Sequence, residues 1–379
     1  MVIGLLLIYW VHNQYYIEVV VTPLSSFEGR QYPFISVIVP ARNEENNIRR
    51  CVKALLNQDY PNFEVIVVED RSTDRTPQIL AQLQAEERKG RLLVIRGEEL
   101  PPGWAGKPHA LVQGATAARG DWLCFVDADT FASPSLLVST LESAWSTGAD
   151  LFTMLTYQEL ASFWEKAVLP LIFTGLSVGF PARRVNNPEL SDAIASGQFI
   201  LVRRDVYEAT GGHASVRERI DEDKALAELI KGSGYRLVLA DGRAVARTQM
   251  YTNLGGIWEG FTKNIYLGLR DRLGLLLFGA IVGLFGALAL PFWLVAGLFW
   301  WGAEGGLQPG IVSAQAVVLW VYLLFVRARQ AIALEISPWY ALTLPLGALI
   351  FTAMMFTSTV NVLSGRGVRW KERVYYQKD

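Results

Sequence analysis

Residues 34–45 read FISVIVPARNEE, and this stretch decides the fold. Its first six residues are mostly apolar and β-branched, which is typical of a strand buried on both faces. A proline then ends the strand, and Asn43 with two glutamates provides a helix start. Residues 63–74, FEVIVVEDRSTD, repeat the pattern. A buried strand that runs into a polar turn and a helix is the repeating unit of an α/β protein.

Two further strand patterns continue the series outward, at residues 91–95 and 122–126. Helical patterns at residues 45–56, 76–89 and 109–118 separate the strands. Alternation at this spacing predicts a mostly parallel, doubly wound sheet. Ligands bind beyond the carboxyl ends of the strands in such sheets, so polar residues that follow strands are the candidate functional residues.

The distribution of charge predicts a second, membrane-bound part. The chain has 379 residues, of which 51% are hydrophobic and 19% are charged, against about 25% charged in soluble proteins. Residues 273–365 carry only Glu304, Arg327, Arg329 and Glu335 as charged side chains. The remainder has an ordinary soluble composition. The sequence therefore predicts an α/β domain followed by transmembrane helices, and excludes both a simple cytosolic enzyme and a pure channel.

Three apolar runs, residues 273–301, 310–326 and 339–363, are long enough to cross a bilayer. Buried core helices are the alternative, but such helices rarely lack a polar face. Residues 1–11 are too short for an ordinary span and lack the features of a signal peptide, so they predict a short anchor or an interfacial segment.

The topology of the runs stays open at this stage. Arg270 and Arg272, Arg327 and Arg329, and the basic tail at residues 366–379 would all be cytoplasmic under the positive-inside rule. Three single crossings would instead leave the tail outside. Either the tail breaks the rule, or one run is not a simple span; Pro291 would allow a re-entrant hairpin in the first run.

Net charge and cysteine usage exclude other classes. The formal net charge is −1, which argues against nucleic acid as a partner because duplex binding needs a cationic face. Cys51 and Cys124 lie far apart in apolar patterns, so neither a disulfide framework nor a zinc site is expected. The three histidines share no metal-ligand spacing and are expected to be loop or core residues.

Carboxylates follow two of the predicted strands. Asp70 comes directly after the second strand, where a base or ribose could be bound, whereas Asp74 is better explained as a helix cap. Asp127 and Asp129 follow the fourth strand in the sequence VDADT. Carboxylates at i and i+2 on an extended segment point the same way, so this pair predicts a site for Mg²⁺ or Mn²⁺.

Other polar groups occur in loops. Lys107 lies in a Pro/Gly loop as GWAGK and could reach phosphates as a point charge. Neither a P-loop nor a GxGxxG motif is present, so nicotinamide and flavin cofactors are not indicated.

Ser196, Gly197 and Gln198 form a small-residue turn before a strand. Residues 221–223 read DED at a helix start, where Asp221 is expected to be the N-cap and the crowding of acids would favour a general base.

Two further segments predict helices at the membrane interface. Residues 162–180 are apolar and aromatic but too broken to span, and residues 253–269 place Trp258, Phe261 and Ile265 at helical spacing. The predicted organisation is an anchor and linker at 1–29, the α/β domain at 30–250, an interfacial amphipathic helix at 251–272, transmembrane helices at 273–365 and a basic tail at 366–379.

In order, the motifs SVIVPARNEE, VVEDRSTD, WAGK, VDADT, SGQFILVRRDVYEATGG and IDED resemble those of the family 2 glycosyltransferases, inverting membrane-associated enzymes with a GT-A fold. The resemblance covers about residues 34–266. The GWAGK block and the tail GRGVRWKERVY are most similar to members that glycosylate lipids, including ceramide, hopanoid-associated and carotenoid-acid glycosyltransferases.

The resemblance implies a role for each matching residue. The uridine of a UDP-sugar would be held by Pro40, Ala41, Arg42, Glu44 and Asp70. Lys107 would approach the diphosphate or the donor sugar, Asp127 the nucleotide, and Asp129 the divalent metal. Asp223 would be the catalytic base. Ser196, Gly197, Gln198, Glu222 and Trp258 would form the acceptor side.

One departure concerns processivity. Polymerising members carry Gln-x-x-Arg-Trp on an interfacial helix, where this chain has WEGFTKN at residues 258–264. The chain also has too few predicted spans to form a channel for a polymer. The resemblance therefore implies transfer of a single sugar to a hydroxyl or carboxyl group of a lipid. It further implies a location in the plasma membrane, with the catalytic domain in the cytoplasm.

Alternative functions remain open at the level of sequence. A polyprenyl-phosphate glycosyltransferase would use a phosphate acceptor and need little help from a base. A transporter or flippase with a nucleotide-sensing domain is a different class, although the spans lack the intramembrane acids and bases expected of transport. A nucleotidyltransferase would need a Gly-rich, Arg-containing loop, which the sequence lacks.

Overall fold

The computed structural model describes residues 16–26, 31–269, 284–305 and 307–364, together with residues 4, 5, 9, 13, 281, 368–370 and 373–375. A seven-stranded sheet has the strand order β3-β2-β1-β4-β8-β6-β9. Its strands are β1 (Ile35–Ala41), β2 (Phe63–Glu69), β3 (Leu92–Arg96), β4 (Trp122–Phe125), β6 (Leu151–Leu155), β8 (Ile200–Arg203) and β9 (Leu237–Asp241).

The sheet is mostly parallel, as the sequence predicts. Strand β1 pairs in parallel with β2 on one side and with β4 on the other, so that Ile35 lies opposite both Phe63 and Trp122. Only β8 runs against its neighbours β4 and β6. The strand order reverses at β1, and a ligand crevice is expected at the carboxyl ends of β1 and β4.

Helices cover both faces of the sheet. Alternate side chains of β1 enter different cores: Val37 and Val39 pack in one, and Ile38 packs in the other. The first core is covered by α2 (Ile48–Leu56), α3 (Thr76–Glu86) and α5 (Leu136–Thr147), and the second by α4 (Gly106–Ala117), α8 (Arg204–Thr210) and α10 (Glu222–Gly232). A small sheet of β5 (Thr130–Ala132), β10 (Ala246–Thr248) and β7 (Tyr157–Gln158) adjoins them.

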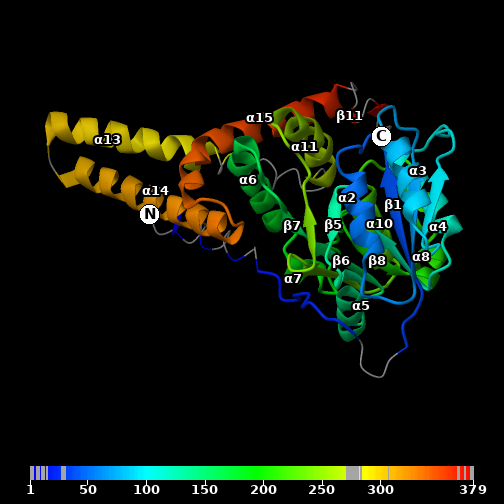
Figure 1. Cartoon of the computed structure of the whole chain (residues 1–379). Helices are drawn as coiled ribbons and strands as arrows, with labels where there is room; N and C mark the ends of the chain where they lie inside the picture. The colour runs from blue at the N-terminus through cyan, green and yellow to red at the C-terminus, as the bar shows by residue number, and fades with distance from the viewer. Residues whose placement is uncertain are drawn as a thin grey trace.

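A helical layer lies between this domain and a helical hairpin (Figure 1). The layer consists of α6 (Phe163–Gly179), α11 (Leu254–Leu269) and α15 (Leu344–Leu363), whose buried residues form one apolar cluster. The hairpin consists of the π-helical turn η2 (Phe285–Ala289), α13 (Leu290–Glu304) and α14 (Leu307–Ala333). The 3-10 turn η3 (Pro338–Thr343) joins α14 to α15, and β11 (Val368–Trp370) and β12 (Arg373–Tyr375) follow.

Three helices are long and apolar enough to cross a membrane: Phe163–Val185, Leu307–Ala333 and Pro338–Asn361. Residues 162–180, which were interpreted as too broken to span, form the helix α6 without a break at Pro170, and this segment has the length and composition of a candidate span. The second and third predicted runs are confirmed as apolar helices. The first run lies partly outside the described residues; its described part ends in the shorter apolar helix Pro291–Ala303.

No hairpin forms at Pro291. This proline stands in the first turn of α13, where a missing N–H costs little, and the π turn before it continues the helix. The chain turns back at Gly305 instead, between α13 and α14.

Candidate active site

The loops after β1 and β2 are bonded to each other. The Arg42 guanidinium donates from Nη1 to the backbone oxygen of Asp70 at 2.8 Å, and Asp70 N donates to Ala41 O at 2.8 Å. Glu44 N donates to Thr76 Oγ1 at 2.8 Å. The predicted uridine-binding residues of these two loops therefore lie together at the carboxyl edge of the sheet, and Asp70 is buried there.

Asp74 has the structural role expected of it. Its carboxylate accepts hydrogen bonds from Thr76 N at 2.9 Å and from Glu45 N at 3.0 Å. Desolvation would raise the pKa of Asp74, but the hydrogen bonds that its carboxylate accepts outweigh this effect, so the pKa lies below its usual value. Asp74 therefore orders the start of α3 and ties it to the neighbouring loop.

The segment after β4 is a turn and not an extended strand. Thr130 N donates to Asp127 O at 3.0 Å, which closes a four-residue turn. The expectation that Asp127 and Asp129 point the same way because they alternate along a strand is therefore wrong. Both residues nevertheless lie within one turn. Burial, followed by the charges of Asp129 and Asp127, raises the pKa of Tyr251.

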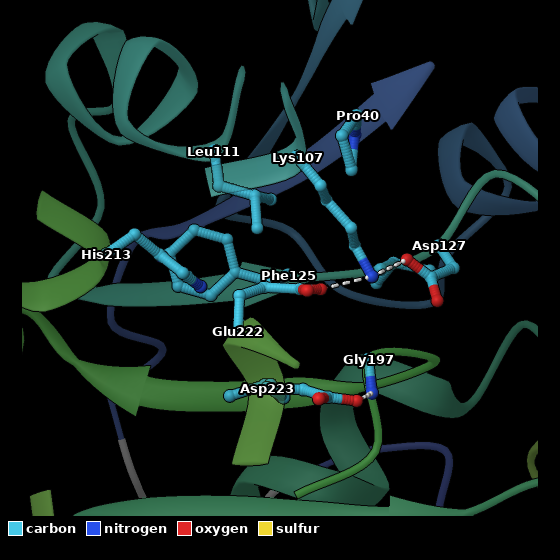
Figure 2. Close-up of a pocket in the computed structure, with 11 residues that line it drawn as sticks. Pro40, Lys107, Leu111, Phe125, Asp127, Gly197, His213, Glu222 and Asp223 are labelled. Carbon is cyan, nitrogen blue, oxygen red and sulfur yellow. Dashed lines mark hydrogen bonds and ion pairs between the residues drawn. The ribbon is translucent and has the colours of Figure 1, made fainter. Parts of the chain in front are cut away.

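A pocket lies at the ends of β1 and β4, where the strand order reverses (Figure 2). Its lining residues are Pro40, Lys107, Leu111, Phe125, Val126, Asp127, Gly197, Ile200, His213, Glu222 and Asp223. Elements far apart in sequence thus bring a lysine, three carboxylates and an apolar wall into one place.

Lys107 joins two of these carboxylates. Its Nζ lies 2.7 Å from Asp127 Oδ1 and 2.7 Å from Glu222 Oε1, and Figure 2 shows the side chain extending between them. Burial lowers the pKa of Lys107, but Asp127, Glu222 and Asp223 outweigh that effect and raise it well above its ordinary value. Lys107 therefore carries a positive charge at every physiological pH.

Asp223 lies in the first turn of α10 on the other side of the pocket. Its Oδ2 accepts a hydrogen bond from Gly197 N at 3.0 Å, and its Oδ1 accepts one from Lys224 N at 2.7 Å. Burial, followed by the charge of Glu222, raises the pKa of Asp223 to about 6, although Lys107 acts in the opposite direction. A carboxylate with this pKa is ionised at pH 7 and can still accept a proton.

Asp221 does not cap α10 with its side chain, contrary to expectation. It occupies the N-cap position, but its carboxylate pairs with Arg219, at 2.8 Å from Nε and 2.7 Å from Nη2. The guanidinium competes successfully for the carboxylate because it offers two parallel charged donors.

Gly197 forms the pocket wall between Lys107 and Asp223. A Cβ atom at this position would lie 2.7 Å from Lys107 Nζ, 3.1 Å from Asp127 Oδ2 and 3.4 Å from Asp223 Oδ2. Any side chain here would displace charged groups of the pocket. The absence of a side chain at position 197 is therefore a requirement of the site.

His213 is a pocket residue that sequence reasoning did not select, although it was correctly expected to be a core histidine. The ring is buried, and its Nδ1 lies 3.0 Å from the hydroxyl of Tyr207. Burial lowers the pKa of His213 to about 3, so the ring is neutral. Its position directly after Gly211 and Gly212 was the available signal, but a glycine turn alone does not predict a pocket.

Several predicted site residues lie beside the pocket. Gln198 accepts hydrogen bonds at Oε1 from Thr156 and Gln158, at 2.6 and 3.0 Å. Ser196 N donates to Thr153 Oγ1 at 3.0 Å. Trp258 packs with the apolar cluster of α6, α11 and α15. The residues of the β1 and β2 loops other than Pro40 are also absent from the pocket lining within the described part of the chain.

An acidic pocket at the switch point of a mostly parallel sheet defines an α/β protein of the nucleotide-binding class. A family model described as glycosyl transferase family 2 matches residues 36–211. The 4,4'-diaponeurosporenoate glycosyltransferase of Staphylococcus aureus (strain USA300) is 27% identical over 260 residues, which cover 67% of each chain.

Among solved structures, mannosyltransferase PcManGT from Pyrobaculum calidifontis, in complex with GDP-Man and Mn²⁺, is similar with a TM-score of 0.55 and 20% identity, over 95% of this chain and 94% of that one. The predicted fold class is confirmed. Residues 36–211 match the family 2 glycosyl transferase model, and the chain is a glycosyltransferase with a GT-A fold.

A divalent cation is common in this class, and the residues here have the chemistry to hold one. Asp127 and Asp129 offer hard carboxylate oxygens within one turn. The described residues contain no group of three or more His, Cys, Asp or Glu side chains that could hold a metal by themselves. Two carboxylates suit Mg²⁺ or Mn²⁺ that completes its coordination with substrate phosphates and water.

Proposed function

We propose that this glycosyltransferase transfers one sugar from a UDP-sugar to a hydroxyl or carboxyl group of a membrane lipid, with inversion at the anomeric carbon. The observation that carries the proposal is the placement of Asp223, with a pKa of about 6, across the pocket from Lys107 and Asp127. A base and a cation on opposite sides of one pocket suit attack by an acceptor and departure of a diphosphate.

The donor side is formed by the loops after β1, β2 and β4. Arg42 and Asp70 join the first two loops, and their position at the switch point supports binding of the nucleoside. Lys107 would leave its present carboxylate partners to reach the diphosphate, which has a greater charge. A divalent cation on Asp127 and Asp129 would neutralise the diphosphate when bound.

The reaction would be a single displacement. Asp223 takes the proton of the acceptor hydroxyl, whose oxygen forms a bond to the anomeric carbon as the bond to UDP breaks on the opposite face. The Gly197 N–H keeps the carboxylate oriented at 3.0 Å. Lys107 stabilises the negative charge that develops on the leaving diphosphate.

A lipid acceptor is supported by two independent features. The staphylococcal relative acts on 4,4'-diaponeurosporenoate, a carotenoid acid, and three helices of this chain are apolar enough to cross a membrane. The helical layer beside the catalytic domain would offer such an acceptor an apolar path. The replacement of Gln-x-x-Arg-Trp by WEGFTKN at residues 258–264 supports transfer of one sugar and not a polymer.

Release of UDP tests the proposal. Purified protein is incubated with UDP-glucose, UDP-galactose or UDP-N-acetylglucosamine and Mn²⁺, with and without a lipid extract of the source membrane. UDP that appears only when lipid is present is the expected result. Release from GDP-mannose alone would overturn the donor assignment, and a lack of lipid-dependent release from every donor would overturn the proposed reaction.

A further inference from the structure

The helices α13 and α14 form an antiparallel hairpin that stands away from the catalytic domain (Figure 1). Midway along α13, a Cβ at Gly297 would lie 2.5 Å from Ser313 Oγ. Near the tip of the hairpin, a Cβ at Gly310 would lie 3.6 Å from the Trp301 ring. Apolar side chains along both helices are exposed: Phe292, Trp293, Val295, Leu298, Phe299, Trp300, Trp301, Leu307, Ile311, Val317, Val318, Val321 and Phe325. Such a surface needs an apolar environment.

The length of α14 corresponds to the thickness of a bilayer. The shorter helix α13 reaches a similar length only together with η2, from Phe285 to Glu304. From residue 307 to residue 326, α14 carries no charged side chain, and at 1.5 Å per residue this part is about 30 Å long. The hydrocarbon core of a bilayer has about the same thickness. Glu304, beside the turn, is the one charged residue between positions 285 and 326.

Helix α6 cannot cross with the hairpin, although its length and composition would allow it. The chain enters α6 soon after β7 and leaves it at Phe180. Phe180, Ala182 and Val185 are then buried in the same core as Leu151 and Ile200 of the central sheet. Both ends of α6 are thus attached to the catalytic domain, on one side of any membrane.

Helix α15 is held against α6 and α11 along its length. A Cβ at Gly347 would lie 2.5 Å from Ala167 O, and one at Gly175 would lie 3.4 Å from the Phe351 ring. Met354 and Met355 are buried with Phe261 of α11. Beyond α15, strand β11 contacts α11 as well. Elements fixed to the catalytic domain therefore accompany α15 at its start, middle and end.

We propose that α13 and α14 cross the bilayer as a hairpin, while α6, α11 and α15 lie on its surface. The chain then crosses twice, and the tail at residues 366–379 lies on the side of the catalytic domain. All three basic groups, at residues 270–272, 327–329 and in the tail, come to that same side, as the positive-inside rule requires. The proposal builds on the proposed function in one respect, that the surface layer receives the lipid acceptor.

Single cysteines with an impermeant PEG-maleimide test this topology. The native Cys51 and Cys124 are fully buried, so the unmodified folded chain is the unlabelled baseline. Gly302→Cys marks the hairpin tip, and Gly232→Cys on α10 is its matched control, since a Cβ at either position has no atom within 4 Å. Asp379→Cys marks the tail. Labelling is compared in intact cells and in inside-out vesicles of the same expression host.

The expected result is that Gly302→Cys and Gly232→Cys are labelled from opposite sides, and Asp379→Cys from the side of Gly232→Cys. Labelling of the tip from the control's side, or from neither side, would overturn the crossing of the hairpin. Labelling of the tail from the opposite side would show that α15 crosses. A second tip variant, Ala303→Cys, must agree with Gly302→Cys. Because labelling needs no catalysis, failure of the topology is distinct from failure of the proposed reaction.

Discussion

At the scale of single residues, the account depends on a few charged groups in one pocket. Lys107 is held between Asp127 and Glu222, and Asp223 faces the same space with a raised pKa. In the proposed reaction the two classes of charge have separate tasks: the cation would act on the leaving group, and the carboxylate would act on the acceptor. Because the proposed roles belong to different side chains, each can be tested by a substitution at one residue.

Activity should depend on the ionisation of Asp223. A general base works only when deprotonated, so kcat/KM should rise with pH through about 6 and reach a plateau above it. The measurement is a pH profile of UDP release between pH 4.5 and 9 with a hydroxyl acceptor. A profile that is flat through pH 6, or that falls there as pH rises, would contradict the assignment of Asp223.

A methyl group at position 197 should disturb the site more than one on the surface. Gly197→Ala places its Cβ 2.7 Å from Lys107 Nζ, whereas Gly232→Ala has no atom within 4 Å. Misplacement of reacting groups by about 1 Å costs roughly 100-fold in rate. We expect a loss of at least about tenfold in kcat for Gly197→Ala and wild-type rates for Gly232→Ala. Equal rates for the two variants would refute the role of Gly197.

Removal of a divalent cation should stop the reaction reversibly. With excess EDTA we expect UDP release to fall to background, and added Mn²⁺ or Mg²⁺ should restore it, because the anionic carboxylates of Asp127 and Asp129 repel the diphosphate unless a cation lies between them. Asp129→Asn should lower activity at saturating Mn²⁺ by about 100-fold or more. Full activity in EDTA would show that Lys107 suffices without a metal.

At the scale of elements, Pro170 links the hairpin to the surface layer. A proline has no N–H, so the Lys166 carbonyl four residues earlier loses its donor within α6. Arg327 Nη2 donates to Lys166 O at 3.0 Å, and Gln330 Nε2 donates to Pro170 O at 2.7 Å. Arg327 is therefore buried against α6, and α14 supplies the hydrogen bond that the proline removed.

The contribution of this contact should depend on the proline. Arg327→Met leaves the Lys166 carbonyl without a donor, at a cost of about 1–3 kcal/mol. Pro170→Ala restores the backbone donor, so Arg327→Met should cost less in that background. Thermal unfolding midpoints in detergent for the two single variants and the double variant measure the coupling. Additive shifts in the midpoint would contradict it.

The sequence alone predicted the secondary-structure elements whose conformation depends on neighbouring residues in the chain. The strands at Ile35–Ala41 and Phe63–Glu69 were predicted because β-branched runs with polar turns have few alternative structures. Elements that depend on distant partners were not predicted. Residues 162–180 were interpreted as too broken to span, whereas α6 runs through Pro170 with a compensating donor from Arg327, about 160 residues away. Asp127 and Asp129 were expected on a strand, but the turn closed by Thr130 needs the neighbouring sheet.

The residues of the pocket were partly predictable for a related reason. The motif after the fourth predicted strand identified Asp127, since parallel strands bring their carboxyl ends together. Lys107 was predicted from its Pro/Gly loop, and Asp223 from the resemblance to the family 2 glycosyltransferases. His213 was missed as a pocket residue because its burial against Tyr207 and Phe125 is set by tertiary packing. The number of membrane crossings could not be counted from sequence, because α6 also has the length and composition of a candidate span, and the proposal that it does not cross depends on the attachment of its ends to the catalytic domain.

At the scale of the whole molecule, the two halves suit two substrates of opposite character. The GT-A domain holds the charged pocket that we propose binds a sugar nucleotide, and the helical layer of α6, α11 and α15 lies between that domain and the proposed membrane hairpin (Figure 1). A lipid acceptor would reach Asp223 from this layer without leaving an apolar environment. The central claim is that a single sugar passes to a lipid with Asp223 as the base.

The most direct test of that claim is a comparison of purified wild type and Asp223→Asn with UDP-sugar, Mn²⁺ and membrane lipids, with UDP release and lipid mass followed together. Asp221→Asn is the matched control, because Asp221 pairs with Arg219 at the same helix start. The account predicts one sugar per lipid, one UDP per product, and a loss of about 10²–10⁴-fold in turnover for Asp223→Asn alone. Wild-type turnover by Asp223→Asn, or UDP release without a glycosylated lipid, would contradict it.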